Sequence, residues 1–437
     1  MINTNHFKDF CEYSKISFTF GDAKKYKEGY LWKVKGKRYR EEAGYFGRYC
    51  GCLKCSCLFS SCCCCNSSRY WFILTSDFIV YLKDKESNVI EEIMLFDTSF
   101  NICHEHKYTG ESNGIFIKNS YAEIILKAKD EIEQMIWVKT IKEAFRESDW
   151  STKMVKPFGS FAPERLSNYC KEIIDGKDYF EEVYDALKNA KKVVYISDFW
   201  MSPKVYLKRP VALDPNLRDQ SSRLDVVLKE IADRGVKVYV LLYKEVPFVC
   251  PLNSKYAKEV LISLSPNIKV ARHPNELISF WSHHEKILII DNELVLIGGI
   301  DLSFGRVDTK EHPLFDYPDE NGLVLFPGQD YFNERIKNFE KVDKPDYSHI
   351  DRYSQPKLPW HDLAVKLKGP IVKDFIMHFI QYWNHAIINI NGSLKDGLNF
   401  LYPVFCESTE TQEVTSKLTK KPISQKVHLL VKVGKCI

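Results

Sequence analysis

The spacing of hydrophobic residues changes near residue 150, which divides the chain into two predicted parts. In the first part, short runs rich in aromatic and β-branched residues predict strands. These runs are 30–34, 70–74, 78–82 and 123–126. Apolar residues then recur at helical spacing over 130–145, which predicts one amphipathic helix. We therefore expect residues 26–149 to form a small barrel of strands with a helix at its C-terminal end. The N-terminal segment, 1–25, carries little signal.

A linker at 150–168, which contains Pro157, Gly159 and Pro163, leads to a part in which helices and strands alternate. Helical spacing occurs at 179–192, 222–234 and 254–263, and strand-like runs follow at 193–197, 236–243 and 268–272. This alternation predicts a layered α/β domain with a mainly parallel sheet at 169–405. A further helix is predicted at 370–385. The last segment, 406–437, ends in a predicted strand, 427–433, without the structure that should follow it, and so looks truncated.

One stretch, 281–308, combines strand patterning with charged residues and glycines. It predicts a strand at 286–290, a turn at Asp291, and a second strand at 294–297 that ends in a Gly-Gly pair. Because side chains two apart on a strand share a face, we expect His284 and Lys286 to point the same way. Asp291 has the opposite parity, so we interpret it as an anchor of the turn.

An imidazole beside an ammonium indicates chemistry on a phosphate ester. An unprotonated imidazole can attack phosphorus, while the ammonium holds the phosphoryl oxygens as negative charge builds. This chemistry requires no metal ion and no other cofactor, and we expect none. H-x-K alone is common on half-buried strands, but H-x-K-x-x-x-x-D followed by G-G-x-D favours a functional site.

The bulk composition describes an ordinary globular protein. Of its 437 residues, 45% are hydrophobic and 27% are charged, and the net charge of +4 is too small to argue for a nucleic-acid partner. No apolar run reaches the roughly 18 residues that a bilayer-spanning helix needs. The N-terminus lacks the apolar core of a signal peptide, so we expect synthesis and residence in the cytosol.

Two features of the first part suggest contact with a membrane. A basic cluster suits a phosphoinositide headgroup or an anionic bilayer, although a solvated basic loop explains it equally well. The cluster consists of Lys33, Lys35, Lys37, Arg38 and Arg40. The second feature is a loop, 44–68, that holds eight of the fourteen cysteines.

Three interpretations of the cysteine loop remain open. Disulfides are not expected in a cytosolic protein. A zinc knuckle needs two separated cysteine pairs, and only Cys52-x-x-Cys55 offers one, with no histidine nearby. Reversible S-acylation fits exposed cysteines flanked by apolar residues at a membrane. Its candidate sites are the four consecutive residues Cys62, Cys63, Cys64 and Cys65. The loop can also lack any chemical role.

The pattern H-H-E-K-x-x-x-I-D-x-x-x-x-x-x-G-G-I-D-L-x-x-G-R resembles the first HKD half of the eukaryotic phosphatidylcholine-cleaving phospholipases D. Further segments resemble that family, in the same order along the chain. They are 175–180, 196–203, 207–210, 242–246, 326–331, 350–353, 359–362 and 378–384. Together these segments extend the resemblance over most of residues 26–384.

The resemblance implies a pleckstrin-homology domain, acylated cysteines and a phospholipase D catalytic half. It implies a cytoplasmic enzyme, peripheral on membranes, that cleaves phosphatidylcholine to phosphatidic acid and choline through a phosphohistidine. His284 would be the nucleophile or the acid/base, Lys286 the phosphate clamp, Asp291 the turn anchor, and Asp301 a group that orients an imidazole. His361, beside Trp360, is a candidate supporting residue, although a structural role is the more common one. Only Lys395 is basic where the family has a phosphoinositide-binding stretch, so activation through that stretch is not expected.

The chain contains the complete motif once, at His284, whereas the chemistry needs two histidines. Three explanations follow. The chain is a piece of a larger enzyme that lacks the second HKD half, it forms a homodimer that brings two His284 together, or it is an inactive module that binds and tethers lipid. We favour the first. A single-motif nuclease or other dimeric phosphodiesterase fits less well, because the Gly-Gly-Ile-Asp sequence is of the eukaryotic type.

Overall fold

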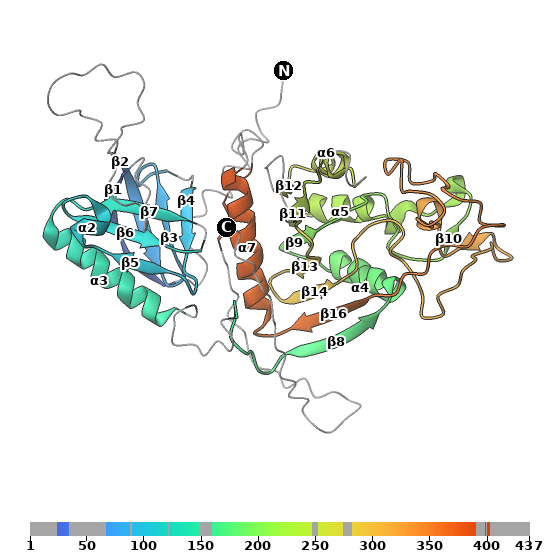
Figure 1. Ribbon diagram of the computed structural model, residues 1–437, viewed down its shortest axis with the longest axis horizontal. Coiled ribbons are helices and arrows are strands. Elements are labelled where there is room, and N and C mark those ends of the chain that lie inside the picture. The colour runs from blue at the N-terminus through green and yellow to red at the C-terminus, as the bar shows by residue number, and fades with distance from the viewer. Residues whose placement is uncertain are drawn as a thin grey trace, which may run out of the picture. The chain divides into compact units, whose positions relative to one another are not determined.

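The computed structural model describes the chain in two compact units that divide between Pro163 and Glu164 (Figure 1). The described residues are 24–34, 67–87, 90–120, 122–148, 150, 160–246, 252–273, 282–389, 398 and 400–402. Four of the five predicted lipid-binding residues, from Lys35 to Arg40, and the four predicted acylation sites, Cys62 to Cys65, lie outside them. The predicted linker spans the division between the units, and the finer domain boundaries stay predictions.

The first unit is a seven-stranded antiparallel sheet with the order β4-β3-β2-β1-β7-β6-β5. Its strands are β1 (Lys25–Val34), β2 (Ser67–Thr75), β3 (Phe78–Leu82), β4 (Ile90–Leu95), β5 (Asn101–Cys103), β6 (Gly114–Lys118) and β7 (Glu123–Lys127). A short helix, α2 (His106–Thr109), lies between β5 and β6, and α3 (Glu131–Glu147) follows β7.

Helix α3 begins at a capping residue and buries a large aromatic side chain. The Asp130 carboxylate accepts the Glu133 N–H at 2.8 Å, which satisfies one of the free donors of the first turn. Trp137 on this helix is completely buried. The four predicted strands and the predicted helix are confirmed, while β4, β5, β6 and α2 were not predicted. That this unit is a pleckstrin-homology domain stays a prediction.

The second unit contains a seven-stranded mixed sheet with the order β12-β11-β9-β13-β14-β16-β8. Its strands are β8 (Tyr169–Ile174), β9 (Val193–Asp198), β11 (Lys237–Tyr243), β12 (Ile268–His273), β13 (Ile287–Ile290), β14 (Leu294–Gly298) and β16 (Leu363–Lys368). The pair β10 (Val211–Ala212) and β15 (Leu323–Val324) forms a separate ribbon. The helices are α4 (Gly176–Lys188), α5 (Leu224–Asp233), α6 (Ser254–Leu264) and α7 (Val372–Asn389), with short 3-10 turns η2 (Pro215–Leu217), η3 (Gln220–Ser222) and η4 (Gly328–Asp330).

The expectation of a mainly parallel sheet is wrong. Only β12, β11 and β9 run parallel, and they are the strands that the three helix–strand repeats predict. From β9 onward every neighbouring pair is antiparallel. The short turn between β13 and β14 accounts for one of these pairs, because a tight turn can only return the chain antiparallel to itself. The other antiparallel pairs join segments that are distant in the sequence.

Helices cover the mixed sheet on both faces. Helices α4 and α5 lie on one side, and α7 lies on the other (Figure 1). Alternate residues of β9 pack against the helices on opposite faces of the sheet. Val194 belongs to the core that also contains Phe180 and Leu228 of α4 and α5, whereas the Tyr195 ring lies 4.9 Å from that of Phe379 on α7. Within the part of the chain that the structure describes, every helix is too short or too polar to cross a bilayer.

Candidate active site

The predicted catalytic pair lies where β13 begins, beside the C-terminal end of β9. Strand β13 runs antiparallel to β9, with Ile287 opposite Ser197. The residues that lead into β13 therefore approach Asp198, the last residue of β9. Groups at the carboxyl ends of strands commonly form the sites of α/β sheets.

His284 is exposed and carries an imidazole that is easily kept neutral. Its ring lies 4.6 Å from that of Phe199, between ring centroids, and the Phe199 ring stacks on Tyr243 at 5.2 Å. Partial burial against this aromatic wall lowers the pKa of His284 below its ordinary value of 6.5, and the nearby Lys286 ammonium lowers it further. An unprotonated imidazole is the form that can attack phosphorus.

Lys286 points to the same side as His284, as predicted, but its ammonium is already paired. Nζ lies 2.8 Å from Asp301 Oδ1 and donates to the His284 carbonyl oxygen at 3.2 Å. The Lys286 side chain is only 4% exposed. This contact joins the residues that lead into β13 to the Gly-Gly-Ile-Asp segment. It also fixes a cation near the His284 imidazole.

Asp301 contacts cations and a backbone donor. Besides Lys286, its carboxylate accepts the Trp200 N–H at 3.2 Å and lies 3.7 Å from Arg306 Nε. The Arg306 guanidinium packs on the Trp360 ring, 3.9 Å from its centroid. Because these contacts are with cations, the expectation that Asp301 orients an imidazole stays a prediction.

Asp198 adds a second buried carboxyl group to the cluster. Burial, and then the neighbouring Asp301, raise the pKa of Asp198 well above its ordinary value. Its Oδ2 accepts the Leu302 N–H at 3.0 Å. Two cations, Lys286 and Arg306, both contact the Asp301 carboxylate. Cations beside an easily neutral imidazole suit a phosphate anion.

The other side of the same strand entry holds a closed hydrogen-bonded network. The Glu285 carboxylate lies 2.6 Å from His378 Nε2 of α7 and accepts the Ser197 hydroxyl at 2.5 Å. Ser197 Oγ also lies 2.9 Å from His283 Nε2. Burial alone would raise the pKa of Glu285, but His378 outweighs it and lowers that pKa to about 2. Burial opposes the charge on His378 too, yet Glu285 raises its pKa overall.

Asp291 lies in the turn between β13 and β14, as predicted, and its carboxylate contacts backbone donors. It accepts the N–H groups of Lys191, Lys192 and Val193 at 2.7–3.0 Å. Asp291 and Asn292 have φ values of 54° and 63°, the left-handed conformation that Asp and Asn tolerate best after glycine. The structure therefore gives this residue a positioning role in the hairpin.

Gly299 permits the close backbone approach that the Gly-Gly pair predicts. A Cβ atom at this position would lie 2.2 Å from Asp362 Oδ1, far inside van der Waals contact. The segment before β16 thus packs directly against the strand that leads to Asp301.

Two other predicted residues are engaged elsewhere. His361 is 72% exposed and binds Asp175 at 2.7 Å between Nδ1 and Oδ1. Lys33, the described member of the basic cluster, pairs with Glu92 at 2.5 Å and also contacts the Tyr81 hydroxyl. Its ammonium is therefore occupied in this structure, and lipid binding by the basic cluster stays a prediction.

Sequence reasoning assigned no role to several charged members of the site. Asp198 and Arg306 belong to segments that carry the family resemblance. Their place in those segments was the only feature of the sequence that pointed to a role in the site. The pairing of Glu285 with His378 joins residues 93 positions apart, and nothing local in the sequence indicates it.

The phospholipase D family model matches residues 186–422, which is more than half of the chain. The chain belongs to the phospholipase D family. The matched range contains His284 and each residue of the cluster around it. Homologues of this family are phosphodiester hydrolases, and the chain carries the family's HKD motif.

Curated phospholipases D resemble most of this chain but are much longer. "Phospholipase D zeta 2" of Arabidopsis thaliana is 34% identical over 405 residues, 88% of this chain and 37% of that protein. "Phospholipase D1" of Saccharomyces cerevisiae is 39% identical over 276 residues, 62% and 16%. "Phospholipase D2" of Bos taurus is 32% identical over 339 residues, 72% and 36%. The chain thus spans at most about two fifths of the length of these relatives.

Proposed function

We propose that this chain supplies the first HKD half of a phospholipase D that hydrolyses phosphatidylcholine to phosphatidic acid and choline. The observation that carries the proposal is the exposed, readily neutral imidazole of His284 close to the cations Lys286 and Arg306. The substrate and the membrane association extend the family assignment, because the relatives are named phospholipases D.

In the proposed first step, a His284 ring nitrogen attacks phosphorus and the bond from phosphorus to the choline oxygen breaks. The imidazole is neutral when it attacks, because its pKa is lowered. Lys286 and Arg306 provide positive charge where the phosphoryl oxygens become more negative. The departing choline oxygen takes a proton from a second imidazole, and that group then activates the water that releases phosphatidic acid.

The second imidazole comes from outside the cluster described above. It belongs to a further HKD half or to a second copy of this chain. The exposure of His284 suits either arrangement, because its ring remains accessible on this side of the unit. A peripheral membrane location, with the first unit and its cysteine loop as the anchor, belongs to the same proposal.

An activated lipid tests the nucleophile without the second imidazole. Phosphatidyl-p-nitrophenol releases a phenolate that is stable near neutral pH and needs no proton from an acid group. We expect the purified chain, mixed with micelles of this lipid, to release one equivalent of p-nitrophenolate per chain in a burst. The His284→Asn variant should release none.

The exposed His106 on α2 provides a matched control. His106→Asn should keep the full burst. Equal bursts from wild type and His284→Asn, or no burst from the folded wild type, would contradict the assignment. Choline release from phosphatidylcholine then identifies the partner. Turnover that rises with the square of chain concentration indicates a second copy, whereas turnover only after adding a second HKD half indicates a heterologous partner.

A further inference from the structure

Three side chains that can bind a metal ion meet outside the candidate active site. Asp175 follows β8, His312 lies in the loop between β14 and β15, and His361 precedes β16. One ligand atom from each residue lies within 4.8 Å of the other two. One carboxylate with two imidazoles is a donor set that zinc and its neighbours in the first transition row accept.

The Asp175 carboxylate is buried and only half satisfied. Its side chain is 1% exposed. Oδ1 accepts from His361 Nδ1 at 2.7 Å and from the Asp362 N–H at 3.2 Å. Among the residues that the structure describes, Oδ2 has no hydrogen-bond partner, although His312 Nε2 lies 3.4 Å away. A buried carboxylate oxygen without a donor is costly, so this atom indicates a place for a cation.

His312 is oriented between two buried carboxylates. Nε2 faces Asp175, and Nδ1 lies 3.6 Å from Asp308 Oδ2, also without a hydrogen bond. Asp308 Oδ2 is held by Lys357 Nζ and by the Trp360 N–H, each at 2.7 Å. Histidines that bind metal through one ring nitrogen usually direct the other towards a carboxylate or carbonyl oxygen. His312 has this arrangement, with Nε2 directed towards Asp175 Oδ2.

The backbone holds two of the ligands in unusual conformations. Asp175 and His312 have φ values of 67° and 45°, in the left-handed region that residues other than glycine rarely adopt. Such strain persists where the surrounding structure demands it, and functional sites are common among these places.

The distances fit a tetrahedral ion after a small movement of one side chain. With ligand bonds of about 2.0–2.1 Å, neighbouring ligand atoms of tetrahedral zinc are about 3.3 Å apart. The separation of 3.4 Å between His312 Nε2 and Asp175 Oδ2 already matches this value. The His361 imidazole must move closer to the other two ligand atoms to reach the same spacing. Its side chain is 72% exposed, which leaves room for this movement.

We propose that Asp175, His312 and His361 bind one zinc ion, with water in the fourth position. This site is separate from the imidazole and ammonium of the proposed phospholipase, and it serves as a structural clamp. It ties the turn after β8 to the segment before β16, which the Asp175 N–H already joins through the Asp362 carbonyl oxygen at 2.9 Å.

The clamp lies next to the wall of the candidate active site. A Cβ atom at Gly176 would lie 2.3 Å from the Arg306 carbonyl oxygen, so the turn after Asp175 packs directly on that residue. Arg306 in turn stacks on Trp360 and faces Asp301. Zinc therefore steadies the segments that present Arg306.

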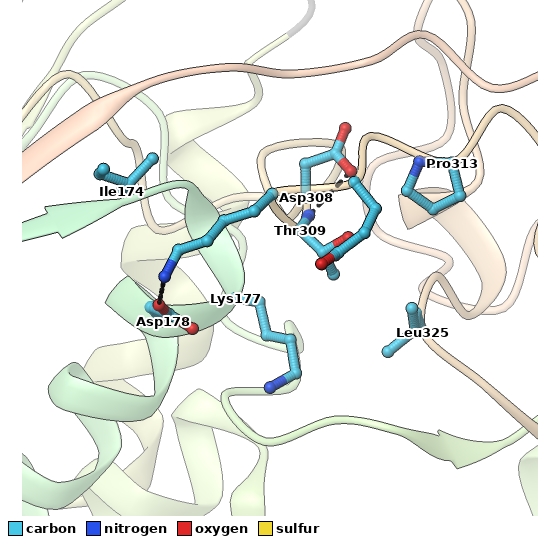
Figure 2. Close-up of a pocket in the computed structure, with 9 residues that line it drawn as sticks. Ile174, Lys177, Asp178, Asp308, Thr309, Pro313 and Leu325 are labelled. Carbon is cyan, nitrogen blue, oxygen red and sulfur yellow. Dashed lines mark hydrogen bonds and ion pairs between the residues drawn. The ribbon is translucent and has the colours of Figure 1, made fainter.

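A cavity lies beside the cluster. It has a volume of about 450 Å³ and is lined by the chain neighbours of Asp175 and His312 (Figure 2). The lining contains three acidic residues, Asp178, Asp308 and Glu311, and two basic ones, Lys177 and Lys310.

Cobalt(II) is the probe, because it takes zinc sites and absorbs visible light. The cysteines are first alkylated with iodoacetamide, so that no thiolate contributes to cobalt binding. We expect the metal-free, alkylated full-length chain to bind one cobalt ion, with d–d bands and no thiolate charge-transfer band. Zinc should displace the cobalt. His361→Asn should weaken binding at least about 10-fold, and the double variant with His312→Asn should abolish the bands.

His106→Asn is the control, and it should bind cobalt as the wild type does. Because His361 is largely exposed, its variant should fold, and circular dichroism checks this. Zinc should raise the Tm of the wild type and leave that of His361→Asn unchanged. No cobalt bands at millimolar cobalt, or equal affinity in wild type and His361→Asn, would overturn the proposal. The titration uses no lipid, so its failure leaves the phospholipase proposal standing, and the reverse also holds.

Discussion

Residues 283–286 lead into β13, and their two sides differ in exposure, in charge and in the groups that they contact. His284 and Lys286 lie on the side of α4 and α5, where the imidazole is exposed and two cations, Lys286 and Arg306, contact Asp301. His283 and Glu285 lie on the side of α7, where the charge of Glu285 is matched by His378. Alternation along a strand is enough to separate the two sides. One side is arranged to meet an anion, and the other fixes the strand that carries the nucleophile.

Burial has opposite consequences on the two sides. Partial burial and then the nearby Lys286 lower the pKa of His284 and outweigh the opposing effect of Asp301, which favours the neutral imidazole. His378 is buried more deeply, yet its pKa is raised because Glu285 contacts it at 2.6 Å. The comparison shows that a carboxylate partner, more than depth, decides the direction in which the pKa of a histidine moves.

The largest difference between the two sides should appear when the nucleophile is removed. Replacing His284 by Asn should lower phospholipid cleavage by about 10⁴-fold or more, because no other group replaces a covalent nucleophile. The free energy of unfolding should change by less than about 0.5 kcal/mol, since the side chain is exposed. Choline release with the matching second half, and urea unfolding, measure the two quantities. A large loss of stability would mean that His284 has a structural role.

The buried cation on the same side should matter for folding as well as for catalysis. Lys286→Met leaves Asp301 buried without its closest cation, which should cost about 3–5 kcal/mol of the free energy of unfolding. Lys310→Met is the matched control, because that lysine forms an exposed pair with Asp178 and should contribute less than about 1 kcal/mol. Urea unfolding of both variants measures the two changes in the free energy of unfolding. Equal effects would show that the Lys286–Asp301 contact is not an energetic feature of the site.

On the α7 side, Glu285→Gln should cost on the order of 3 kcal/mol and change how stability depends on pH. The pKa of Glu285 falls from 4.5 to about 2 on folding, so its contribution is present above pH 4.5 and is lost as pH falls towards 2. The pKa of His378 is raised above 6.5, so its contribution is present below pH 6.5 and is lost as pH rises through the higher value.

The stability difference between wild type and Glu285→Gln should therefore be largest between pH 4.5 and 6.5. Urea unfolding from pH 2 to pH 9 measures it. A difference that does not vary with pH would contradict a charged Glu285–His378 pair.

The turn anchor should have a smaller effect than either charged pair. Asp291→Ala removes the acceptor of three backbone N–H groups and should cost about 1–3 kcal/mol. Asp291→Asn keeps one acceptor oxygen and tolerates the left-handed backbone, so it should cost less. Thermal unfolding of the two variants ranks them, and a costlier Asn variant would contradict the anchoring role.

The smallest expected effect is a shift in a pH profile. The p-nitrophenolate burst requires neutral His284, whose pKa lies below 6.5, so the rate should fall to half at a pH below 6.5. Burst rates between pH 4 and 8 give the midpoint. A midpoint above 6.5 would mean that a carboxylate, such as Asp301, stabilises the protonated imidazole.

The spacing of apolar residues and the turn residues predicted those features that depend only on residues close together in the sequence. The hairpin of β13 and β14, the shared side of His284 and Lys286, and the turn position of Asp291 all follow from alternation and turn chemistry. The parallel order of β9, β11 and β12 follows from the helix–strand repeats.

The remaining features depend on contacts between distant segments. The antiparallel half of the sheet depends on β16 pairing with β14 and on β8 pairing with β16, and their sequences do not indicate these partners. The carboxylate of Asp301 was expected beside an imidazole, but the fold brings Lys286 to it. Burial and then Asp301 raise the pKa of Asp198, whereas burial opposes the rise in the pKa of His378 that Glu285 produces. Both partners lie far along the chain, so no local sequence window contains these shifts.

The most direct test of the central claim is the location of the covalent intermediate. The chain is mixed with phosphatidyl-p-nitrophenol, denatured at alkaline pH to preserve phosphohistidine, digested, and analysed by mass spectrometry. We predict a phosphatidyl adduct on His284, in an amount equal to the p-nitrophenolate burst. An adduct on another residue, or a full burst with His284 unmodified, would contradict the assignment of His284 as the nucleophile.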